Sequence, residues 1–411
     1  MAQSYVVTIE KPVFGGDALG HLPDGRAVFV PFVLPQEEVL VTLVQDKPRY
    51  ARGIPVEIIK PSPLRIDAKC PHFATCGGCH YQHINYTLQL ETKQAVLIDQ
   101  LARIGKINNP PLSQIVPCEN PWNYRNHIQF HQGKDGKPGF IDVTGTHILP
   151  IQECHLPQDT INNIWPQINL EANSGIHRLG LRQDSNEEIM LVLEGQDETA
   201  PEFSLDLSIS AAYLSPEGFL TNLAGEDALY YRIKDRLLRV SPESFFQVNL
   251  AQAEKMLDFV LASLPTIKTR PEILELYSGV GFFSTFLAER ASQLTAVEAS
   301  RSACFDFAIN LDAFDNVSLY EAAVEDTLPA LNLKPDIIVL DPPRSGLDKK
   351  ARKSLLALES PFIIYVSCDP ATLSRDLRHF IEADYQLKEI KAFDLFPQTY
   401  HIESISLLQR K

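Results

Sequence analysis

Residues 274–281 read Leu-Glu-Leu-Tyr-Ser-Gly-Val-Gly, an apolar run that ends in a short glycine turn before a segment of helical length. In open α/β sheets such a turn lies at the carboxyl end of a strand, where the backbone can approach a bound cofactor. Further apolar runs end near residues 298, 341 and 367, and helix-length segments separate them. These runs are four to seven residues long, which is typical of buried parallel strands. We therefore expect residues 241–411 to form a doubly wound α/β domain.

The glycine turn predicts a cofactor site, and the next strand narrows the choice of cofactor. Gly279 and Gly281 alone are a weak signal, but Glu298 ends the following strand about twenty residues on, where a carboxylate can accept hydrogen bonds from a ribose diol. The pair suits either a nicotinamide or S-adenosylmethionine. A dinucleotide fingerprint would have a third glycine where Ser284 stands. The sequence therefore favours S-adenosylmethionine, and a tight turn without a ligand is the remaining alternative.

The ends of the later strands carry reactive side chains. Asp341 begins an Asp-Pro-Pro sequence, which occurs in methyltransferases that act on a planar nitrogen or a ring carbon, and Arg344 stands where adenine-modifying enzymes have an aromatic residue. Cys368 ends the next strand. A lone cysteine is more often a buried apolar residue, but a thiolate beside the cofactor could attack a base. Glu403 precedes the terminal strand and is a candidate general base, although an acid in a loop is usually solvated.

Three of the seven cysteines crowd into ten residues, as Cys70, Cys76 and Cys79. Three thiolates at this spacing predict a metal or iron–sulfur site. Zinc and an iron–sulfur cluster fit the spacing equally well, since several histidines lie nearby. The fourth ligand could come from Cys154 or Cys118.

The remaining chain divides into two further predicted parts. Residues 1–61 alternate apolar and polar positions in five short runs with Gly and Pro turns, which predicts a small barrel of the oligonucleotide-binding type. Residues 62–240 contain the cysteines, one helical pattern and several alternating runs, so we expect a mixed α+β central domain.

The charge pattern leaves room for a nucleic-acid partner. The 411 residues carry a formal charge of −15, but residues 157–230 hold thirteen acids against two basic residues, and the first seventy residues balance. Residues 349–353 are locally basic, and binding of nucleic acid depends on the local field. No apolar run is long enough for a membrane helix and no leader is visible, so we expect a cytoplasmic protein with no membrane contact. A monomer is the expected state.

Taken in order, these motifs resemble the RNA uridine-5-methyltransferase family, which forms 5-methyluridine with S-adenosylmethionine. The resemblance covers nearly the whole chain. It implies an RNA-binding TRAM barrel over residues 1–61, an iron–sulfur-containing central domain and a Rossmann-like methyltransferase domain. It also implies the following functional residues: Cys70, Cys76, Cys79 and Cys154 for a [4Fe–4S] cluster, Gln247, Tyr277, Gly279, Glu298 and Asp341 for the cofactor and the base, and Cys368 and Glu403 for catalysis.

The sequence departs from the family at three positions. Phe282 and Ala322 stand where, or near where, many relatives have a cofactor-contacting Asn, and Ser278 replaces a common cysteine. We therefore do not transfer the two Asn contacts. The residues implied for catalysis are unchanged.

The resemblance implies a covalent mechanism in which the Cys368 thiolate adds to carbon 6 of uracil and Glu403 removes the proton from carbon 5. It favours ribosomal RNA as the substrate, because the iron–sulfur motif is more usual among the ribosomal enzymes, with the T-loop of tRNA as the alternative. Two other hypotheses are a cytosine-5 methyltransferase, which uses similar thiolate chemistry, and a non-catalytic RNA-binding or folding factor. We expect the cluster to be structural and the RNA to contact the barrel and the basic run at residues 349–353.

Overall fold

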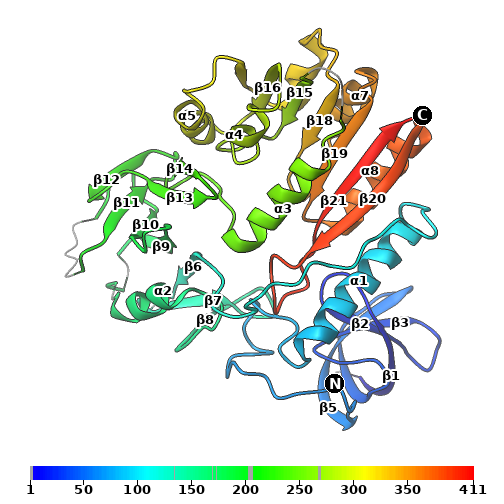
Figure 1. Ribbon diagram of the computed structural model, residues 1–411. Helices are drawn as coiled ribbons and strands as arrows, with labels where there is room; N and C mark the ends of the chain where they lie inside the picture. The colour runs from blue at the N-terminus through cyan, green and yellow to red at the C-terminus, as the bar shows by residue number, and fades with distance from the viewer. Residues whose placement is uncertain (1–2, 134, 169, 173, 202–206, 267–269) are drawn as a thin grey trace.

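The alternating residues near the N-terminus form a closed barrel in the computed structural model, which describes residues 3–133, 135–168, 170–172, 174–201, 207–266 and 270–411 (Figure 1). The strand order around the barrel is β1-β2-β3-β5-β4. The strands are β1 (Ser4–Pro12), β2 (Asp17–His21), β3 (Ala27–Pro31), β4 (Glu38–Asp46) and β5 (Tyr50–Lys60). The predicted five-stranded barrel is therefore confirmed.

The barrel closes because its strands bury alternate residues on the inside. Val28 and Val30 of β3 are fully buried, while their neighbours along the strand are only half-buried. Three register shifts between β4 and β5 bend the long hairpin around the core. Where the chain leaves the barrel, the buried Glu37 carboxylate accepts hydrogen bonds from Arg65 Nη2 at 2.7 Å and from Ser62 N at 3.0 Å. This contact ties the barrel to the segment that follows it.

The central part is a mixed seven-stranded sheet in the order β12-β11-β10-β9-β6-β7-β8. Its pairs are antiparallel except β10 with β11. Its elements are β6 (His127–Gln132), β7 (Pro138–Ile141), β8 (Ile148–Pro150), α2 (Asp159–Ile164), the 3-10 turn Trp165–Gln167, β9 (Ile176–Gln183), β10 (Ile189–Gly195), β11 (Ser210–Leu214) and β12 (Leu220–Ala224). Phe130 and Leu181 on the sheet pack with Trp165 in one apolar core. The predicted mixed, mostly antiparallel arrangement is therefore present.

The C-terminal part is a second seven-stranded sheet in the order β17-β16-β15-β18-β19-β21-β20. The strands β15 to β19 are parallel, and β21 is antiparallel to both of its neighbours. Its strands are β15 (Glu272–Leu276), β16 (Gln293–Glu298), β17 (Val317–Glu321), β18 (Ile337–Leu340), β19 (Phe362–Ser367), β20 (Tyr385–Phe393) and β21 (Glu403–Arg410). The strand order reverses between β15 and β18, and ligands of open α/β sheets bind at such a switch point.

Helices cover both faces of this sheet, so the predicted doubly wound domain is confirmed. Ile273 and Ile337 face one core with α3, α4 and α5, whereas Leu274 and Ile338 face the other with α1, α6, α7 and α8. The helices are α1 (Tyr86–Arg103), α3 (Leu250–Ala262), α4 (Ser284–Leu287), α5 (Arg301–Asn310), α6 (Val324–Thr327), α7 (Lys349–Ala357) and α8 (Pro370–Glu382), with a 3-10 turn at Leu328–Ala330. A separate hairpin of β13 (Leu229–Ile233) and β14 (Arg236–Val240) adds Tyr231 and Val240 to the first of these cores.

One predicted helix is much shorter than expected. The segment at residues 282–291 forms only the single turn α4. Ser284 Oγ donates to Glu275 Oε2 at 2.6 Å, and Thr285 Oγ1 donates to the Gly281 carbonyl at 3.0 Å. Turns flank α4 at residues 281–283 and 288–290, and the chain then returns to the sheet at β16.

Helix α1 follows the cysteine segment in sequence but packs on the C-terminal sheet. Asn85 caps its first turn by accepting a hydrogen bond from Leu88 N at 2.9 Å. Its buried Val96, Leu97 and Leu101 lie in the same core as α8. The predicted central domain, residues 62–240, therefore contributes a helix to its neighbour. Within the described ranges, no helix is both long enough and apolar enough to span a membrane.

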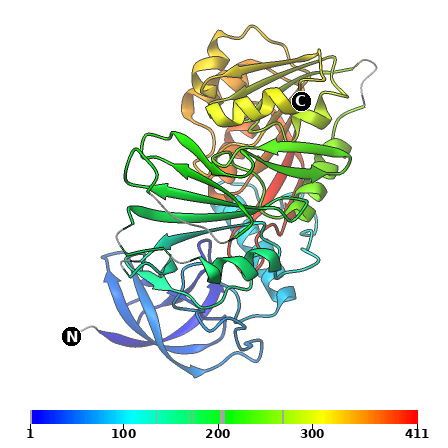
Figure 2. The same cartoon turned by 90° about the vertical axis from the view of Figure 1, so that its left-hand side faces the viewer.

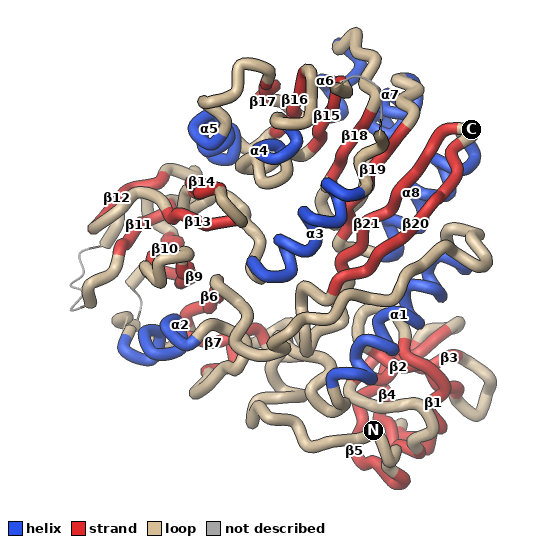
Figure 3. Tube along the Cα trace, in the orientation of Figure 1, coloured by secondary structure: helices blue, strands red, loops and turns tan. Residues whose placement is uncertain are grey.

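The three parts meet in a region that is rich in loops. Figure 1 shows the barrel at the bottom, the C-terminal domain at the top and the central sheet on the left, and Figure 2 shows the central sheet from its outer side. In Figure 3 the loops gather where α1, β7 and the start of β21 approach one another. A buried ion pair between Lys93 of α1 and Asp394 crosses this region, with 2.5 Å between Lys93 Nζ and Asp394 Oδ1.

We predict that Lys93→Met lowers the free energy of unfolding by about 3–5 kcal/mol, because the buried Asp394 carboxylate would lose its charge partner. Both side chains are fully shielded from solvent. Urea denaturation monitored by circular dichroism measures this loss. The matched control is Lys350→Met, because Lys350 pairs with Asp326 on the surface at 2.8 Å and its replacement should change little. Equal effects of the two substitutions would contradict a stabilising role for the buried pair.

Candidate active site

One cavity of about 1090 Å³ opens at the carboxyl ends of β15, β18 and β19. All seven residues that the sequence suggested for the cofactor, the base and catalysis line it: Gln247, Tyr277, Gly279, Glu298, Asp341, Cys368 and Glu403. They come from six different loops and strand ends of the C-terminal part. The parallel strands bring their carboxyl ends to one edge of the sheet, which is why motifs far apart in sequence meet here.

The glycine turn after β15 has a backbone shape that few residues allow. Tyr277 has φ +62° and Gly279 has φ +54°, both in the left-handed region. The Tyr277 N–H donates to the Val297 carbonyl of β16 at 2.9 Å, which holds the turn against the neighbouring strand. A Cβ built on Gly279 would meet no atom within 4 Å, whereas one on Gly281 would lie 2.5 Å from Leu311 Cδ1. The turn is thus packed tightly at Gly281 and open at Gly279.

Glu298 at the end of β16 is fixed by three backbone N–H groups. Its Oε2 accepts from Gly279 N at 2.8 Å, and its Oε1 accepts from Ala299 N at 2.8 Å and Ser300 N at 2.7 Å. A carboxylate offers about four acceptor positions, so capacity remains for hydroxyl groups of a ligand. The turn and this carboxylate together fit the ribose and the adjacent atoms of S-adenosylmethionine.

Three acidic groups crowd the other side of the cavity. Burial raises the pKa of Asp341 to about 7. Burial and the nearby Asp341 carboxylate raise the pKa of Glu403 well above its usual range, with Arg344 acting in the opposite direction. Burial, then Glu403 and Asp341, raise the pKa of Cys368 to about 12. The thiol is therefore protonated at neutral pH in the free protein.

The strand ends hold Cys368 and the Asp-Pro-Pro loop firmly. Asp369 caps α8 by accepting from Ala371 N at 3.0 Å and from Thr372 N at 2.8 Å, so Cys368 lies between the end of β19 and a fixed helix start. On the adjacent loop, Thr372 Oγ1 donates to the Arg344 carbonyl at 3.1 Å. These bonds place the thiol and the Arg344 backbone on one rigid wall.

Gln247 reaches the cavity from a segment held by buried polar groups. The fully buried Asp306 of α5 accepts from Ser241 N at 2.8 Å and from Ser244 Oγ at 2.7 Å. Asn126 Nδ2 at the start of the central sheet donates to the Gln247 carbonyl at 3.1 Å. The segment that the sequence assigned to the cofactor is thus clamped between the central and C-terminal parts.

The cavity also contains residues that the sequence did not single out as functional. Phe396 and His401 line it with their ring centroids 5.6 Å apart. Burial and the positive charge of Arg344 lower the pKa of His401 to about 3, so its ring is neutral. His401 lies within the motif that contains Glu403, so its position could have been inferred, but no local pattern marks Phe396.

A second cavity, of about 350 Å³, is lined by the four predicted cluster residues: Cys70, Cys76, Cys79 and Cys154. Cys118, the alternative fourth ligand, lies elsewhere, with its Sγ 3.4 Å from Asn249 Nδ2. Among the described residues, no group of three or more His, Cys, Asp or Glu side chains is placed to hold a single metal ion. The predicted zinc and iron–sulfur sites therefore have a thiol-lined cavity as their structural basis and nothing more.

The four thiols raise one another's cost of ionisation. Burial raises the pKa of Cys79 to about 12 and that of Cys154 to about 11. The neighbouring thiols add to this increase, whereas the half-buried Arg125 opposes it for both groups. Four thiols that resist ionisation beside one guanidinium form a site that a cationic metal centre would stabilise.

The basic run at residues 349–353 is partly neutralised. Lys350 pairs with Asp326 at 2.8 Å, and Arg352 pairs with the buried Asp376 at 3.0 Å. Lys349 lines the active-site cavity at the start of α7. An RNA contact by this run would therefore rest mainly on Lys349 and Lys353.

Two parts of the chain match known protein families. Residues 3–56 match the TRAM domain family model, and residues 226–411 match the model described as tRNA (uracil-5-)-methyltransferase. RNA methyltransferases of Aquifex aeolicus and Halalkalibacterium halodurans are each 33% identical to this chain and cover 98% of it, with 98% and 96% of their own lengths covered. The crystal structure of Pyrococcus abyssi tRNA (uracil-54, C5)-methyltransferase with S-adenosyl-L-homocysteine is similar with a TM-score of 0.75 and 25% identity, over 98% of this chain and 100% of that one.

The buried Glu275 of β15 predicts a pH-dependent stability. Burial raises its pKa to about 8, so between about pH 5 and 8 the folded protein keeps a proton that the unfolded chain has lost. Stability should therefore fall as the pH rises through this range, and Glu275→Gln should remove part of that fall, of the order of a few kcal/mol. Urea denaturation at several pH values measures the slope. Glu272→Gln, at the exposed start of the same strand, is the control, and equal slopes in both variants would contradict the prediction.

Proposed function

Because the chain belongs to the RNA uracil-5-methyltransferase family, we propose that it transfers a methyl group from S-adenosylmethionine to carbon 5 of a uridine in structured RNA. The observation that carries this proposal is the meeting of Cys368, Glu403 and Asp341 with the glycine turn in one cavity. A nucleophilic thiol, a carboxyl base and a cofactor turn are the groups that this reaction needs.

The cofactor end of the cavity is formed by Glu298, Gly279 and Tyr277. Glu298 has acceptor capacity left for a ribose diol, and Gly279 faces open space. When bound, S-adenosylmethionine supplies an electrophilic methyl group on its sulfonium. Gln247 and Asp341, which also line the cavity, position and polarise the uracil base.

The reaction begins at carbon 6 of uracil. The Cys368 sulfur forms a bond to carbon 6, and its proton passes to the Asp341 carboxylate. The electron pair of the carbon 5–carbon 6 double bond moves onto carbon 5 and oxygen 4 as an enolate. The high pKa of the thiol means that it ionises only as it attacks, and the guanidinium of Arg344 lowers the cost of the thiolate.

Carbon 5 then takes the methyl group, while the bond from that methyl to the donor sulfur breaks and the sulfur keeps the electron pair. Glu403 accepts the proton from carbon 5. The electron pair of that carbon–hydrogen bond re-forms the double bond and expels the Cys368 thiolate. For this step Glu403 must be ionised, and the same Arg344 charge lowers its pKa.

The barrel supports an RNA partner, and the four cysteines bear on which RNA it is. The TRAM match supports RNA binding by residues 1–61, and the target nucleotide must leave its stem or stacked loop to reach the cavity. We favour ribosomal RNA, since the four-cysteine motif is more usual among the ribosomal members of the family. The similarity to the Pyrococcus abyssi enzyme supports tRNA as the second candidate.

We also propose that Cys70, Cys76, Cys79 and Cys154 hold a [4Fe–4S] cluster. Four thiols around one cavity of about 350 Å³, with Arg125 beside them, fit the four thiolates and the negative charge of such a cluster. The cluster would hold together the segments around residues 70–79 and 154, and no step of the reaction passes through it.

We expect label from S-adenosylmethionine to appear in 5-methyluridine of one RNA fraction, when total RNA from a strain lacking this gene is the substrate and ribosomal RNA and tRNA are separated afterwards. Cys368→Ala should reduce turnover to background because the covalent step is lost. Glu403→Gln should slow turnover by about 10²–10⁴-fold and accumulate an RNA–protein adduct on a denaturing gel.

Several outcomes would change the proposal. Label in 5-methylcytidine would establish the cytosine enzyme instead. No label in either fraction, with the cluster content verified, would favour a non-catalytic RNA-binding factor, above all if Cys368→Ala left an effect on RNA folding intact. Label in tRNA alone would select the second substrate.

Iron analysis tests the cluster. Protein purified without oxygen should contain about four iron and four sulfide per chain, and Cys154→Ser should lose most of both. The control is Cys304→Ser, because Cys304 is buried in α5. One zinc per chain and no iron would establish the zinc alternative. A turnover that changes when the cluster is reduced, with the fold unchanged, would contradict a purely structural role.

A further inference from the structure

The loop at residues 394–402 joins β20 to β21 and leads directly into Glu403. Phe396, His401 and Glu403 all line the active-site cavity, and the loop sets the approach of the chain to Glu403, which is the first residue of β21 and pairs with Phe393 of β20. Inside the loop, Thr399 Oγ1 donates to the Phe396 carbonyl at 2.8 Å and accepts from His401 N at 3.3 Å. The rest of its support comes from other segments of the chain.

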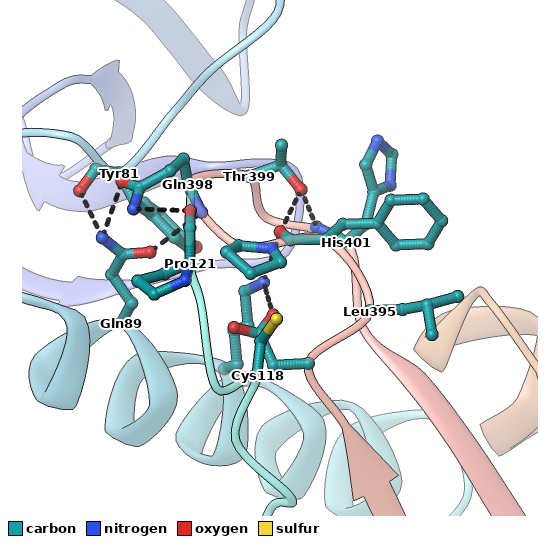
Figure 4. Close-up of polar contacts among 12 residues, drawn as sticks. Tyr81, Gln89, Cys118, Pro121, Leu395, Gln398, Thr399 and His401 are labelled. Atoms are coloured by element: carbon teal, nitrogen blue, oxygen red, sulfur yellow. Dashed lines mark hydrogen bonds and ion pairs between the residues drawn. The ribbon is translucent and has the colours of Figure 1, made fainter. Parts of the chain in front are cut away.

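The amide of Gln89 on α1 forms a reciprocal pair with Gln398 of this loop (Figure 4). Gln89 Nε2 donates to Gln398 Oε1 at 2.9 Å, and the Gln398 N–H donates to Gln89 Oε1 at 3.0 Å. Gln398 has φ +69°, a backbone conformation that side chains rarely adopt. Both residues are buried, so water cannot replace these bonds. The pair therefore fixes the loop at its most unusual residue.

Lys93, one helical turn further along α1, holds the start of the same loop. Its ammonium donates to Asp394 Oδ1 at 2.5 Å and to the Phe396 carbonyl at 2.9 Å. Gln89 and Lys93 are four residues apart and so lie on one face of the helix. One face of α1 is therefore hydrogen-bonded to the loop at both its beginning and its middle.

The segment that follows Cys79 binds the loop as well. The N–H groups of His80 and Tyr81 both donate to the Gln398 carbonyl, at 2.8 and 3.1 Å. Gln89 Nε2 also donates to the Tyr81 carbonyl at 3.2 Å. The cysteine segment, α1 and the loop to Glu403 are therefore one hydrogen-bonded unit.

A helix needs no buried polar side chain to pack on a sheet, and apolar residues of the same size would serve. The neighbouring turns of α1 pack in this way, through Val96, Leu97 and Leu101. The side chains of Gln89 and Lys93 both bond to the loop at residues 394–402, and Gln89 also bonds to the end of the cysteine segment. Buried polar groups of this kind set a geometry as well as contributing stability.

We infer that Gln89 and Lys93 are positioning residues for Glu403, with Gln89 as the member that sets the loop conformation. The inference rests on the proposed function, in which Glu403 removes the proton from carbon 5. A displaced loop would slow that step. It would leave the attack of Cys368 and the binding of the cofactor unchanged, because those groups are held by β19, α8 and the glycine turn.

The test compares Gln89→Met with Gln100→Met on two RNA substrates. Gln100 is a buried glutamine on the same helix, and among the described residues its side chain makes no hydrogen bond to residues 394–402. One substrate is RNA with ordinary uridine. The other carries 5-fluorouridine, which has no proton on carbon 5 to lose, so the methylated adduct with Cys368 persists and can be counted on a denaturing gel.

We expect Gln89→Met to lower kcat on ordinary RNA by about 10- to 100-fold, the scale of a small misplacement of a reacting group. Its KM for S-adenosylmethionine and its rate of adduct formation with 5-fluorouridine RNA should stay near those of the wild type. Gln100→Met should match the wild type in all three measurements. The split between turnover and adduct formation is the signature, since a merely destabilised protein would lose both in proportion.

The inference is overturned if Gln89→Met keeps wild-type turnover, or if turnover and adduct formation fall together. Should Gln89→Met fail to fold by circular dichroism, Thr399→Val carries the test, because it keeps the volume of the side chain and removes its two bonds within the loop. The same split is then expected, and its absence overturns the inference. A wild-type protein that forms no adduct with 5-fluorouridine RNA would instead contradict the proposed function.

Discussion

Lys93 and Asp394 meet in the middle of the molecule with neither side chain exposed to solvent. The two residues are 301 positions apart in the chain. Burying two charges costs several kcal/mol, which only close contact and further hydrogen bonds can offset. The buried ion pair is therefore stable only when its two groups are in close contact, and this contact holds the β20–β21 loop against α1. The barrel reaches the same region, since Lys11 pairs with Asp99 of α1 at 2.7 Å and the Phe14 and Tyr400 rings are in contact.

The active-site cavity is acidic on the side where the base would enter. Burial raises the pKa of Asp341, and the Asp341 carboxylate then makes both Glu403 and the Cys368 thiol harder to ionise, whereas the positive charge of Arg344 opposes the increase for Glu403 and Cys368. A site of this kind holds its protons until a substrate rearranges the local charges. The proposed reaction needs such transfers, since one group must lose a proton before attack and another must accept one afterwards.

The two cavities are close neighbours along the chain as well as in space. Gln247 lines the active-site cavity and Val248 lines the cavity with the four cysteines. Asn126 binds the backbone of both, through its side chain to the Gln247 carbonyl and through its N–H to the Val248 carbonyl. A metal centre that holds the cysteine segments would therefore help to fix two parts of the active-site cavity. One is the segment at Gln247 and Val248, and the other is the loop that leads to Glu403.

The sequence by itself determined the five-stranded barrel, the parallel sheet and the convergence of Gly279, Asp341 and Cys368. Each of these follows from a local pattern, because alternation marks a buried face and parallel strands share one carboxyl edge. Cys154 was reached only through the resemblance to a family, since spacing alone did not separate it from Cys118. The length of α4 was not predicted, because an apolar pattern marks a helical segment better than it marks the boundaries of the helix.

Only the tertiary structure decided the partner of α1 and the role of its polar face. The apolar spacing of residues 91–105 predicts a helix with one buried side, but not which surface covers that side. Lys and Gln side chains are mostly exposed in proteins, and Lys93 and Gln89 are buried here because the β20–β21 loop supplies their partners. The raised pKa values of Asp341 and Glu403 have the same origin. Burial and pairing depend on residues that are distant in the chain, and hydrophobic periodicity carries no information about them.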